Sequence, residues 1–277
     1  MSLKKQIYSY FKMFANSKAS KNKSICSRVF IYHNVDNSQV DVFRNQISIL
    51  KENFDKIVNA SEFVRLSQSN MLNSKKYACI TFDDGFDDVY ENAKPILDEL
   101  NVTATIFLNQ TLYDLTNSNP ENLDDFVNEK FPRLSKIHKN LRGLSEKQMM
   151  QFISDDYEIG GHTYSHISVP KINSEQFEEE IGNQRQFLID RFNYEIKSFA
   201  YPYGRKKDIP NWGAKSLKKC HYDSGFSGIS HELRKLKTIN PFEFPRTSVS
   251  LDINEKEFIN LIKGSSDILD KLTGQYK

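Results

Sequence analysis

The sequence has little cysteine and no long apolar run, and each absence excludes a class of protein. Its 277 residues include only three cysteines, which are widely separated. Cys26, Cys79 and Cys220 form neither a disulfide framework nor a closely spaced metal site, which is typical of a reducing compartment. No apolar run approaches the roughly 20 residues that a membrane-spanning helix needs. We therefore expect a cytoplasmic protein without a membrane span.

The sequence also has little net charge, +2 in total, which argues against nucleic acid as a partner. The charge is uneven, because residues 1–27 contain six lysines and no acidic residue. We predict a basic N-terminal arm here. Its lysines interrupt the apolar core that a secretory signal requires, so export by the usual route is not expected. The arm is either a disordered tail or a weak anchor to anionic lipid at the inner face of the membrane, through its lysines and through Tyr8, Tyr10, Phe11 and Phe14.

Strand-like and helix-like segments alternate along residues 28–277, which we predict to form a single α/β domain. This order favours parallel strands joined by right-handed crossovers, and we expect a barrel of β/α units. The polar stretch at 109–142 interrupts the rhythm and is expected to be an irregular surface insertion in which short helices can occur. The predicted strands lie within 28–35, 77–82, 102–108, 157–166, 196–204, 222–228 and 246–252, and the predicted helices within 41–54, 88–100, 145–155, 174–192, 212–220 and 254–272.

Four aspartates lie within six positions in the run YACITFDDGFDD, directly behind a predicted strand. Asp87 and Asp88 are placed to favour the start of the next helix. Asp83 and Asp84 instead stand at the carboxyl end of the strand, where α/β folds build their sites. Adjacent carboxylates repel one another and lose hydration there, so we expect a cation or a shared proton nearby.

Two histidines four residues apart, His162 and His166, follow another predicted strand in EIGGHTYSH. On a helical turn, this spacing brings both imidazoles to one side. With Asp84 they form the two-histidine, one-carboxylate ligand set of a catalytic zinc, and Asp83 is then free to accept a proton from the attacking water. Non-haem iron oxygenases use the same ligand set. Those enzymes have no reason, however, to keep a second aspartate beside the ligand.

The motifs TFDDG, HTYSH and FAYPYG, in this order, resemble those of the polysaccharide deacetylase family, also called NodB-like or carbohydrate esterase family 4. The resemblance covers about residues 28–250. It implies a distorted or incomplete (β/α) barrel and metal-dependent removal of an acetyl group, usually from N-acetylated sugars. It also implies Asp83 as the general base, and it places Pro202 and Tyr203 at the substrate, with the Tyr203 N–H donating to the oxyanion. One divalent metal is implied on Asp84, His162 and His166. Zinc is the first candidate for this metal, and other transition metals are alternatives.

Two features depart from the usual family pattern. Ala200 stands where an arginine commonly holds the base, and Arg246 in FPRTSV is a candidate to supply that guanidinium from elsewhere in the chain. The usual C-terminal histidine acid is missing, because no histidine follows His231. The early run VFIYHNV resembles the branch that deacetylates poly-β-1,6-N-acetylglucosamine, which makes His33 the candidate general acid. The alternative is a histidine that only stabilises its strand end.

These features predict a hydrolase that acts on an N-acetylated sugar or a surface-polysaccharide precursor. The expected cytoplasmic location favours a nucleotide-linked or lipid-linked form of that sugar. Two alternatives stay open, a catalytically inactive carbohydrate-binding protein on the same fold and a deacylase of another amide or ester. Nothing in the sequence resembles a glycine-rich phosphate cradle, and the expected reaction needs no organic cofactor. His138, His221 and His231 have no motif context and are expected to be structural or surface residues.

Overall fold

The computed structural model of the chain describes residues 3–22, 25–138, 140–231, 233 and 240–275. The strands are β1 (Arg28–Tyr32), β2 (Lys56–Val58), β3 (Tyr77–Phe82), β4 (Thr105–Leu108), β5 (Glu158–Gly161), β6 (Ser198–Ala200), β7 (Ser224–Phe226) and β8 (Thr247–Ser248). The α-helices are α1 (Leu3–Ser20), α2 (Val40–Asn53), α3 (Ala60–Gln68), α4 (Lys94–Glu99), α5 (Gln110–Ser118), α6 (Leu123–Lys130), α7 (Glu146–Ser154), α8 (Ser174–Phe192), α9 (Gly213–Lys219), α10 (Glu255–Ile262) and α11 (Ser265–Leu272).

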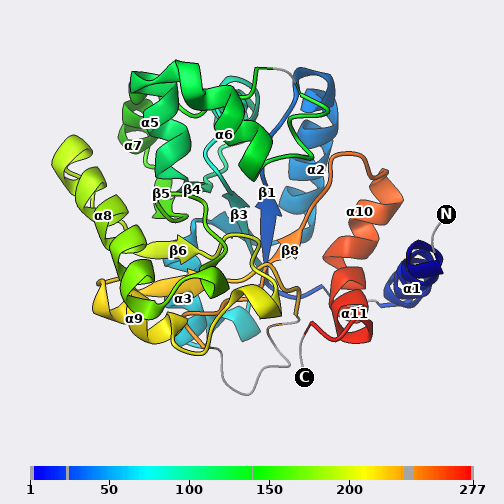
Figure 1. The fold of residues 1–277 in the computed structure, drawn as a ribbon. Helices are drawn as coiled ribbons and strands as arrows, with labels where there is room; N and C mark the ends of the chain where they lie inside the picture. The colour runs from blue at the N-terminus through cyan, green and yellow to red at the C-terminus, as the bar shows by residue number, and fades with distance from the viewer. Residues whose placement is uncertain (1–2, 23–24, 139, 232, 234–239, 276–277) are drawn as a thin grey trace.

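All eight strands pair in parallel in one sheet, with helices packed around its outside (Figure 1). The strand order is β7-β6-β5-β4-β3-β1-β8, and β2 pairs with β3 beside this row. Within the described residues, only a single bridge from Phe226 to Phe244 approaches the break between β7 and β8. The predicted α/β fold, a distorted and incomplete (β/α) barrel, is therefore confirmed. Because every strand runs the same way, all their carboxyl ends meet at one edge.

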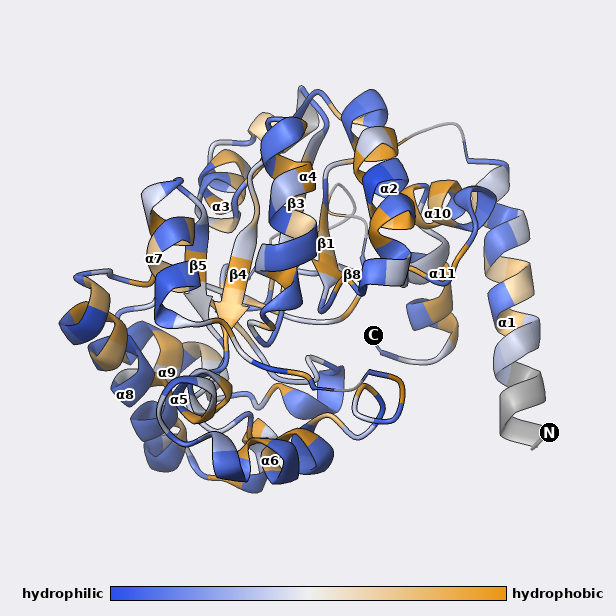
Figure 2. Ribbon diagram, turned by 90° about the horizontal axis from the view of Figure 1, so that it is seen from above, coloured by the Kyte–Doolittle hydropathy of each residue, from blue (hydrophilic) through white to orange (hydrophobic). Residues whose placement is uncertain are grey.

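Alternation along the strands divides the core into two parts. In β3, Ala78 and Ile80 join the layer between the sheet and the outer helices, while Cys79 points into the barrel. In β4, Ile106 joins the outer layer and Phe107 the interior. Strands buried on both faces read as continuous apolar runs, which is why the sequence shows them so clearly. Figure 2 shows the apolar sides of the helices turned toward these strands.

The structure corrects several expectations. Residues 3–20 form the helix α1 instead of a disordered tail, and the predicted helix at 88–100 starts as a π-helix (Val89–Ala93). The insertion at 109–142 contains the short helices α5 and α6, which the sequence allowed, and these pack around an apolar cluster that was not expected. The strand β2 and the helix α3 were not predicted, and the predicted helix at 254–272 is divided into α10 and α11 by Gly264, whose φ is 93°. No helix of the described ranges has the length and apolar character to cross a membrane.

The close approach of β5 to its neighbours gives a testable prediction about Gly160. A Cβ atom there would lie 2.5 Å from the ring of Phe107, so Gly160→Ala should lower the free energy of unfolding by about 1–3 kcal/mol. Gly182 in α8 is the matched control, because a Cβ there meets nothing within 4 Å. Gly182→Ala should stabilise the protein by about 0.5–1 kcal/mol. Denaturant titration measures both changes, and equal effects would contradict the packing explanation.

Candidate active site

The two aspartates that follow β3 are buried, 4% and 2% exposed, and are held in a sharp turn. The N–H of Asp83 donates to the carbonyl of Tyr32 at the end of β1, over 3.0 Å. Asp84 and Gly85 then take φ values of 74° and 78°, and a Cβ on Gly85 would lie 2.8 Å from Leu108 Cδ1. A glycine is therefore required behind Asp84, and the turn lets the two carboxylates contact different partners.

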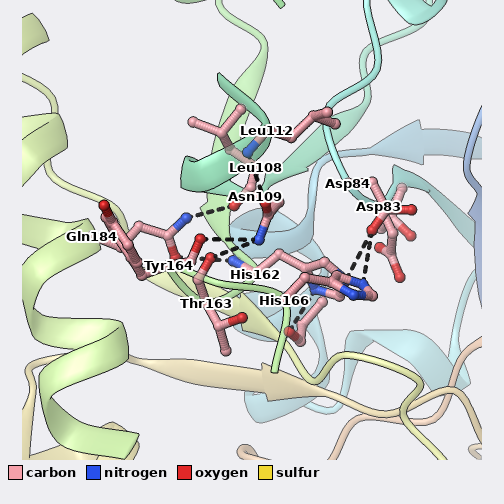
Figure 3. A network of polar contacts seen from close by, with 12 residues as sticks. Asp83, Asp84, Leu108, Asn109, Leu112, His162, Thr163, Tyr164, His166 and Gln184 are labelled. Atoms are coloured by element: carbon pink, nitrogen blue, oxygen red, sulfur yellow. Dashed lines mark hydrogen bonds and ion pairs between the residues drawn. The ribbon is translucent and has the colours of Figure 1, made fainter. Parts of the chain in front are cut away.

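The histidine pair lies in the loop after β5 and not on a helical turn, which corrects the sequence expectation. Thr163 and His166 both have positive φ, 63° and 51°, and this backbone brings the two imidazole ring centroids to 5.2 Å. Asn109, at the end of β4, holds the loop by donating from its side chain to the carbonyls of Thr163 and Tyr164, over 3.1 and 3.2 Å. Figure 3 shows both imidazoles pointing toward the aspartates.

Asp84, His162 and His166 form a group whose ligand atoms lie within 4.8 Å of one another. Asp84 Oδ1 is 3.4 Å from His162 Nε2 and 3.1 Å from His166 Nε2. Ligand atoms about 2.0–2.2 Å from a tetrahedral zinc are separated by about 3.4 Å, so the spacing fits one shared ion. Asp84 Oδ1 is also buried without a hydrogen-bond partner among the described residues. These residues therefore fit a divalent metal.

The nitrogen of His162 that faces away from Asp84 is also fixed. Its Nδ1 lies 2.8 Å from the backbone carbonyl of Ala200, so Nδ1 carries the proton and Nε2 is left to bind a metal. Burial alone would raise the pKa of Asp84, but the contacts with His162 and His166 hold that pKa well below its usual range. Burial lowers the pKa of His166. The protonation of Asp84 therefore depends on the two histidines beside it.

Arg246 lies against Asp83 in a buried, bidentate ion pair. Its Nη1 and Nη2 donate to the two carboxylate oxygens over 2.7 and 2.9 Å, and its Nε donates to the carbonyl of Ser227 over 2.8 Å. The guanidinium also lies over the ring of Phe107, 5.2 Å from its centroid. Burial alone would raise the pKa of Asp83, but the Arg246 charge lowers it. Asp83 is thus kept ionised, as a general base must be before it accepts a proton.

Two other predicted residues, His33 and Tyr203, line the same cavity of about 860 Å³ as the metal ligands and Asp83. His33 follows β1 as Asp83 follows β3, and Tyr32 is in register with Phe82, so both side chains lie at one edge of the sheet. Tyr203 is half exposed, has a φ of 63° and lies edge-on to His166. Its N–H reaches no acceptor within the described residues, so it is left to bind a substrate. Pro202 is buried behind it. The roles of all these residues stay predictions.

Residues 71–222 match the family model of the polysaccharide deacetylases, which is more than half of the chain. The chain belongs to the polysaccharide deacetylase family. The poly-beta-1,6-N-acetyl-D-glucosamine N-deacetylase of Staphylococcus aureus (strain MSSA476) is 26% identical over 246 residues, which cover 87% of this chain and 73% of that protein. YxkH of Bacillus subtilis (strain 168) is 21% identical over 202 residues, which cover 71% of this chain and 62% of YxkH. The family resemblance read from the motifs is therefore confirmed.

Solved structures show the same fold. IcaB from Ammonifex degensii has a TM-score of 0.67 at 16% sequence identity, over 88% of this chain and 98% of IcaB. The deacetylase PplD of Streptococcus pyogenes, solved in complex with acetate, has a TM-score of 0.64 at 18% identity, over 86% and 98% of the two chains. At this identity the structures support the fold alone. Family membership makes metal-dependent hydrolysis of N-acetyl groups the expected activity of this polysaccharide deacetylase.

Sequence reasoning missed the residues that support the site of this polysaccharide deacetylase. Gln184 accepts a hydrogen bond from the His162 N–H over 3.1 Å, and Glu180 accepts from Ser165. Asn109 was detectable, because it follows a predicted strand and caps the helix after it. Gln184 and Glu180 lie within a helix rich in Glu and Gln, and nothing but burial distinguishes Gln184 from its exposed neighbours.

The insertion forms one wall of the cavity, a role that the sequence did not indicate. Phe131, Leu134, Ile137 and His138 all line it. His138, expected to be a structural or surface residue, joins this wall to the loop after β1. Its Nδ1 lies 3.2 Å from Asp36 Oδ2 and its Nε2 lies 3.2 Å from Asn34 Nδ2. The insertion is thus fixed across the opening instead of lying free on the surface.

The ligand assignment predicts how metal content should change on mutation. His162→Ala and Asp84→Asn should each lose the one metal equivalent per chain, because each removes a buried ligand atom. Asparagine tolerates the positive φ at position 84, so that variant should still fold. His138→Ala, in the same cavity, and Asp83→Asn should keep the metal. Elemental analysis of purified protein measures this, and a full equivalent in His162→Ala would contradict the assignment.

Proposed function

We propose that this polysaccharide deacetylase is a metal-dependent hydrolase that removes the acetyl group from an N-acetylated sugar of a surface polysaccharide or its precursor. The observation that carries the proposal is the ligand set Asp84, His162 and His166 beside Asp83, which Arg246 keeps ionised. Zinc is the first candidate metal, because two imidazoles and one carboxylate with an open position are typical of catalytic zinc. Such a metal, when bound, supplies Lewis-acid chemistry.

The protein's own residues then divide the proton transfers. Asp83 accepts a proton from water as the water oxygen adds to the acetyl carbon. The Tyr203 N–H donates to the oxygen that gains negative charge, an interaction worth about 3–4 kcal/mol in other acyl-transfer sites. When the C–N bond breaks, the amine leaves with a proton that His33 donates, and acetate remains. His33 and Asp83 stand at neighbouring strand ends, so the two transfers can occur on opposite sides of one carbon.

The observations do not favour the alternative of an inactive carbohydrate-binding protein. That alternative depended on the missing arginine at position 200. Arg246 supplies a guanidinium to the same carboxylate from a different strand, with two hydrogen bonds in place. An intact base with its partner is more than sugar binding requires. We therefore retain hydrolysis as the proposed activity.

We further propose that the substrate sugar carries a phosphate link, either to a nucleotide or to a lipid. Besides Arg246, which is paired with Asp83, three cationic side chains line the cavity that contains the proposed metal ligands: Lys130, Arg133 and Arg205. Arg133 and Arg205 are exposed, so they are accessible to an anionic substrate. Arginine is suited to phosphate because it can donate two parallel hydrogen bonds. This proposal concerns the form of the substrate and leaves the deacetylation chemistry unchanged.

The Asp83–Arg246 pair predicts non-additive effects on turnover. Asp83→Asn should lower kcat by a factor of about 10² to 10⁴ and leave the metal bound. Arg246→Lys should lower kcat as well, because lysine cannot reproduce the fork geometry. In the Asp83→Asn background, however, Arg246→Lys should cost little further turnover, since Arg246 acts through Asp83. Steady-state kinetics of the two single variants and the double variant measure this, and fully multiplied losses would mean that Arg246 has an independent role.

The acid role of His33 predicts a dependence on the leaving group. His33→Ala should lose most turnover on an N-acetylated sugar, because an amine must be protonated as it departs. On an activated acetyl ester, whose leaving group departs unaided, the variant should keep most of its turnover. Metal content should be unchanged in both. Equal losses on the two substrates would leave His33 a structural residue at its strand end.

The phosphate link predicts a charge-dependent preference for substrate. Arg133→Gln combined with Arg205→Gln should lower kcat/KM about tenfold or more for a diphosphate-linked N-acetylated sugar, since each lost charge-assisted hydrogen bond costs about 1.5–3 kcal/mol. The same variant should act normally on an uncharged oligosaccharide. Comparison of nucleotide-linked and lipid-linked sugars distinguishes the two sources of phosphate. Parallel losses on charged and uncharged substrates would refute the phosphate contact.

A further inference from the structure

The helix α1 lies at the edge of the molecule, beside α11 and away from the sheet (Figures 1 and 2). It packs against α10 and α11, and Ala15 and Ala19 on the packed face are 1% and 0% exposed. Lys12 pairs with Glu257 of α10 over 3.6 Å. The contact with the rest of the protein is therefore made by one face of the helix, on which Phe11, one turn before Ala15, is also partly buried.

The opposite face of α1 carries the large apolar side chains. Tyr10, Met13 and Phe14 are spaced i, i+3 and i+4, so they lie together on one side of the helix. They are 68%, 70% and 48% exposed. Tyr8, nearer the start of the helix and on a different side of it, is 52% exposed as well. Of the ten large apolar side chains exposed among the described residues, four therefore lie within positions 8–14. A helix whose outer face exposes Tyr10, Met13 and Phe14 together is typical of an interaction surface.

The charge of this segment identifies the kind of partner. Residues 1–27 hold six lysines and no acidic residue, and Lys18 and Lys21 are exposed. Aromatic residues and methionine together with lysines match the interface of an anionic bilayer, where rings lie at headgroup level and lysines meet the lipid charge. The rest of the chain has more acidic than basic residues, so an anionic surface attracts this segment specifically.

A second copy of the chain fits this face less well. A symmetric dimer would place the same surface of each copy against the other, and this would bring the lysines of both helices together. Like charges at close range oppose such a contact.

We propose that the outward face of α1, defined by Tyr10, Met13, Phe14 and Lys18 together with Lys21 just after the helix, binds the surface of an anionic lipid bilayer with the helix lying in the plane of the interface. This inference does not depend on the proposed catalytic function.

Vesicle flotation of the full chain tests the proposal. The protein should float with vesicles of phosphatidylcholine mixed with phosphatidylglycerol and stay unbound with phosphatidylcholine alone. Met13→Ser combined with Phe14→Ser should weaken binding about tenfold or more, because it removes most of the apolar area that enters the interface. Met71→Ser combined with Met150→Ser is the matched control, since both residues are exposed elsewhere, 41% and 58%, and should bind as the parent does.

A second variant tests the charge contribution separately. Lys18→Gln combined with Lys21→Gln should weaken binding to the anionic vesicles, and added salt should reduce the difference between this variant and the parent. All variants should keep the far-UV circular dichroism and the metal content of the parent, because the changed side chains are exposed. Three results would overturn the proposal: equal binding to neutral and anionic vesicles, no binding to either, or a dimer in sedimentation that Met13→Ser with Phe14→Ser dissociates.

Discussion

The site depends on one buried ion pair, between Asp83 and Arg246. Both side chains are almost completely buried, so each would be costly without the other: removal of one partner from such a pair typically costs about 3–5 kcal/mol. Arg246 also connects the two ends of the sheet, where β7 and β8 do not pair as strands. Its backbone N–H donates to Ile229 and its Nε to the carbonyl of Ser227, while the strand that follows it pairs with β1. The same residue therefore crosses the break between β7 and β8 and holds the base.

The bounds of the longer strands and helices could be predicted from the sequence, because they depend on the pattern of neighbouring residues. The bounds of β3 and α8 agree with their predicted ranges, since a strand buried on both faces reads as a continuous apolar run and an amphipathic helix has a clear period. The strand β2 could not be found, because three residues show no period. For the segment of α1, the sequence left a disordered tail and a weak lipid anchor as alternatives and did not predict a helix packed on the domain. The buried residues of its contact include Ala15 and Ala19, and no sequence pattern identifies the helices against which they pack.

The candidate site was predictable in its residue types but not in its backbone. The family resemblance, with Ala200 where an arginine commonly holds the base, pointed to Arg246 as the partner of Asp83, although 163 residues separate the two. The spacing of His162 and His166 fits a helical turn as well as a strained loop, and only the structure distinguishes them. Asp84, Thr163, His166 and Tyr203 all have positive φ, which costs on the order of 1–3 kcal/mol for each residue. Such strain is kept only where the surroundings enforce it, and Asn109 and Gln184 do so for the histidine loop.

The ion pair also explains why two adjacent carboxylates can do different work. Arg246 neutralises Asp83 within the protein, so Asp83 needs no external cation and is left to exchange protons. Asp84 faces the opposite way in the turn, toward two imidazoles, and its Oδ1 has no hydrogen-bond partner among the described residues. A buried carboxylate without a fixed cation is stable only if a proton or a metal supplies positive charge. The division of labour between the two residues therefore follows from which of them the chain's own guanidinium reaches.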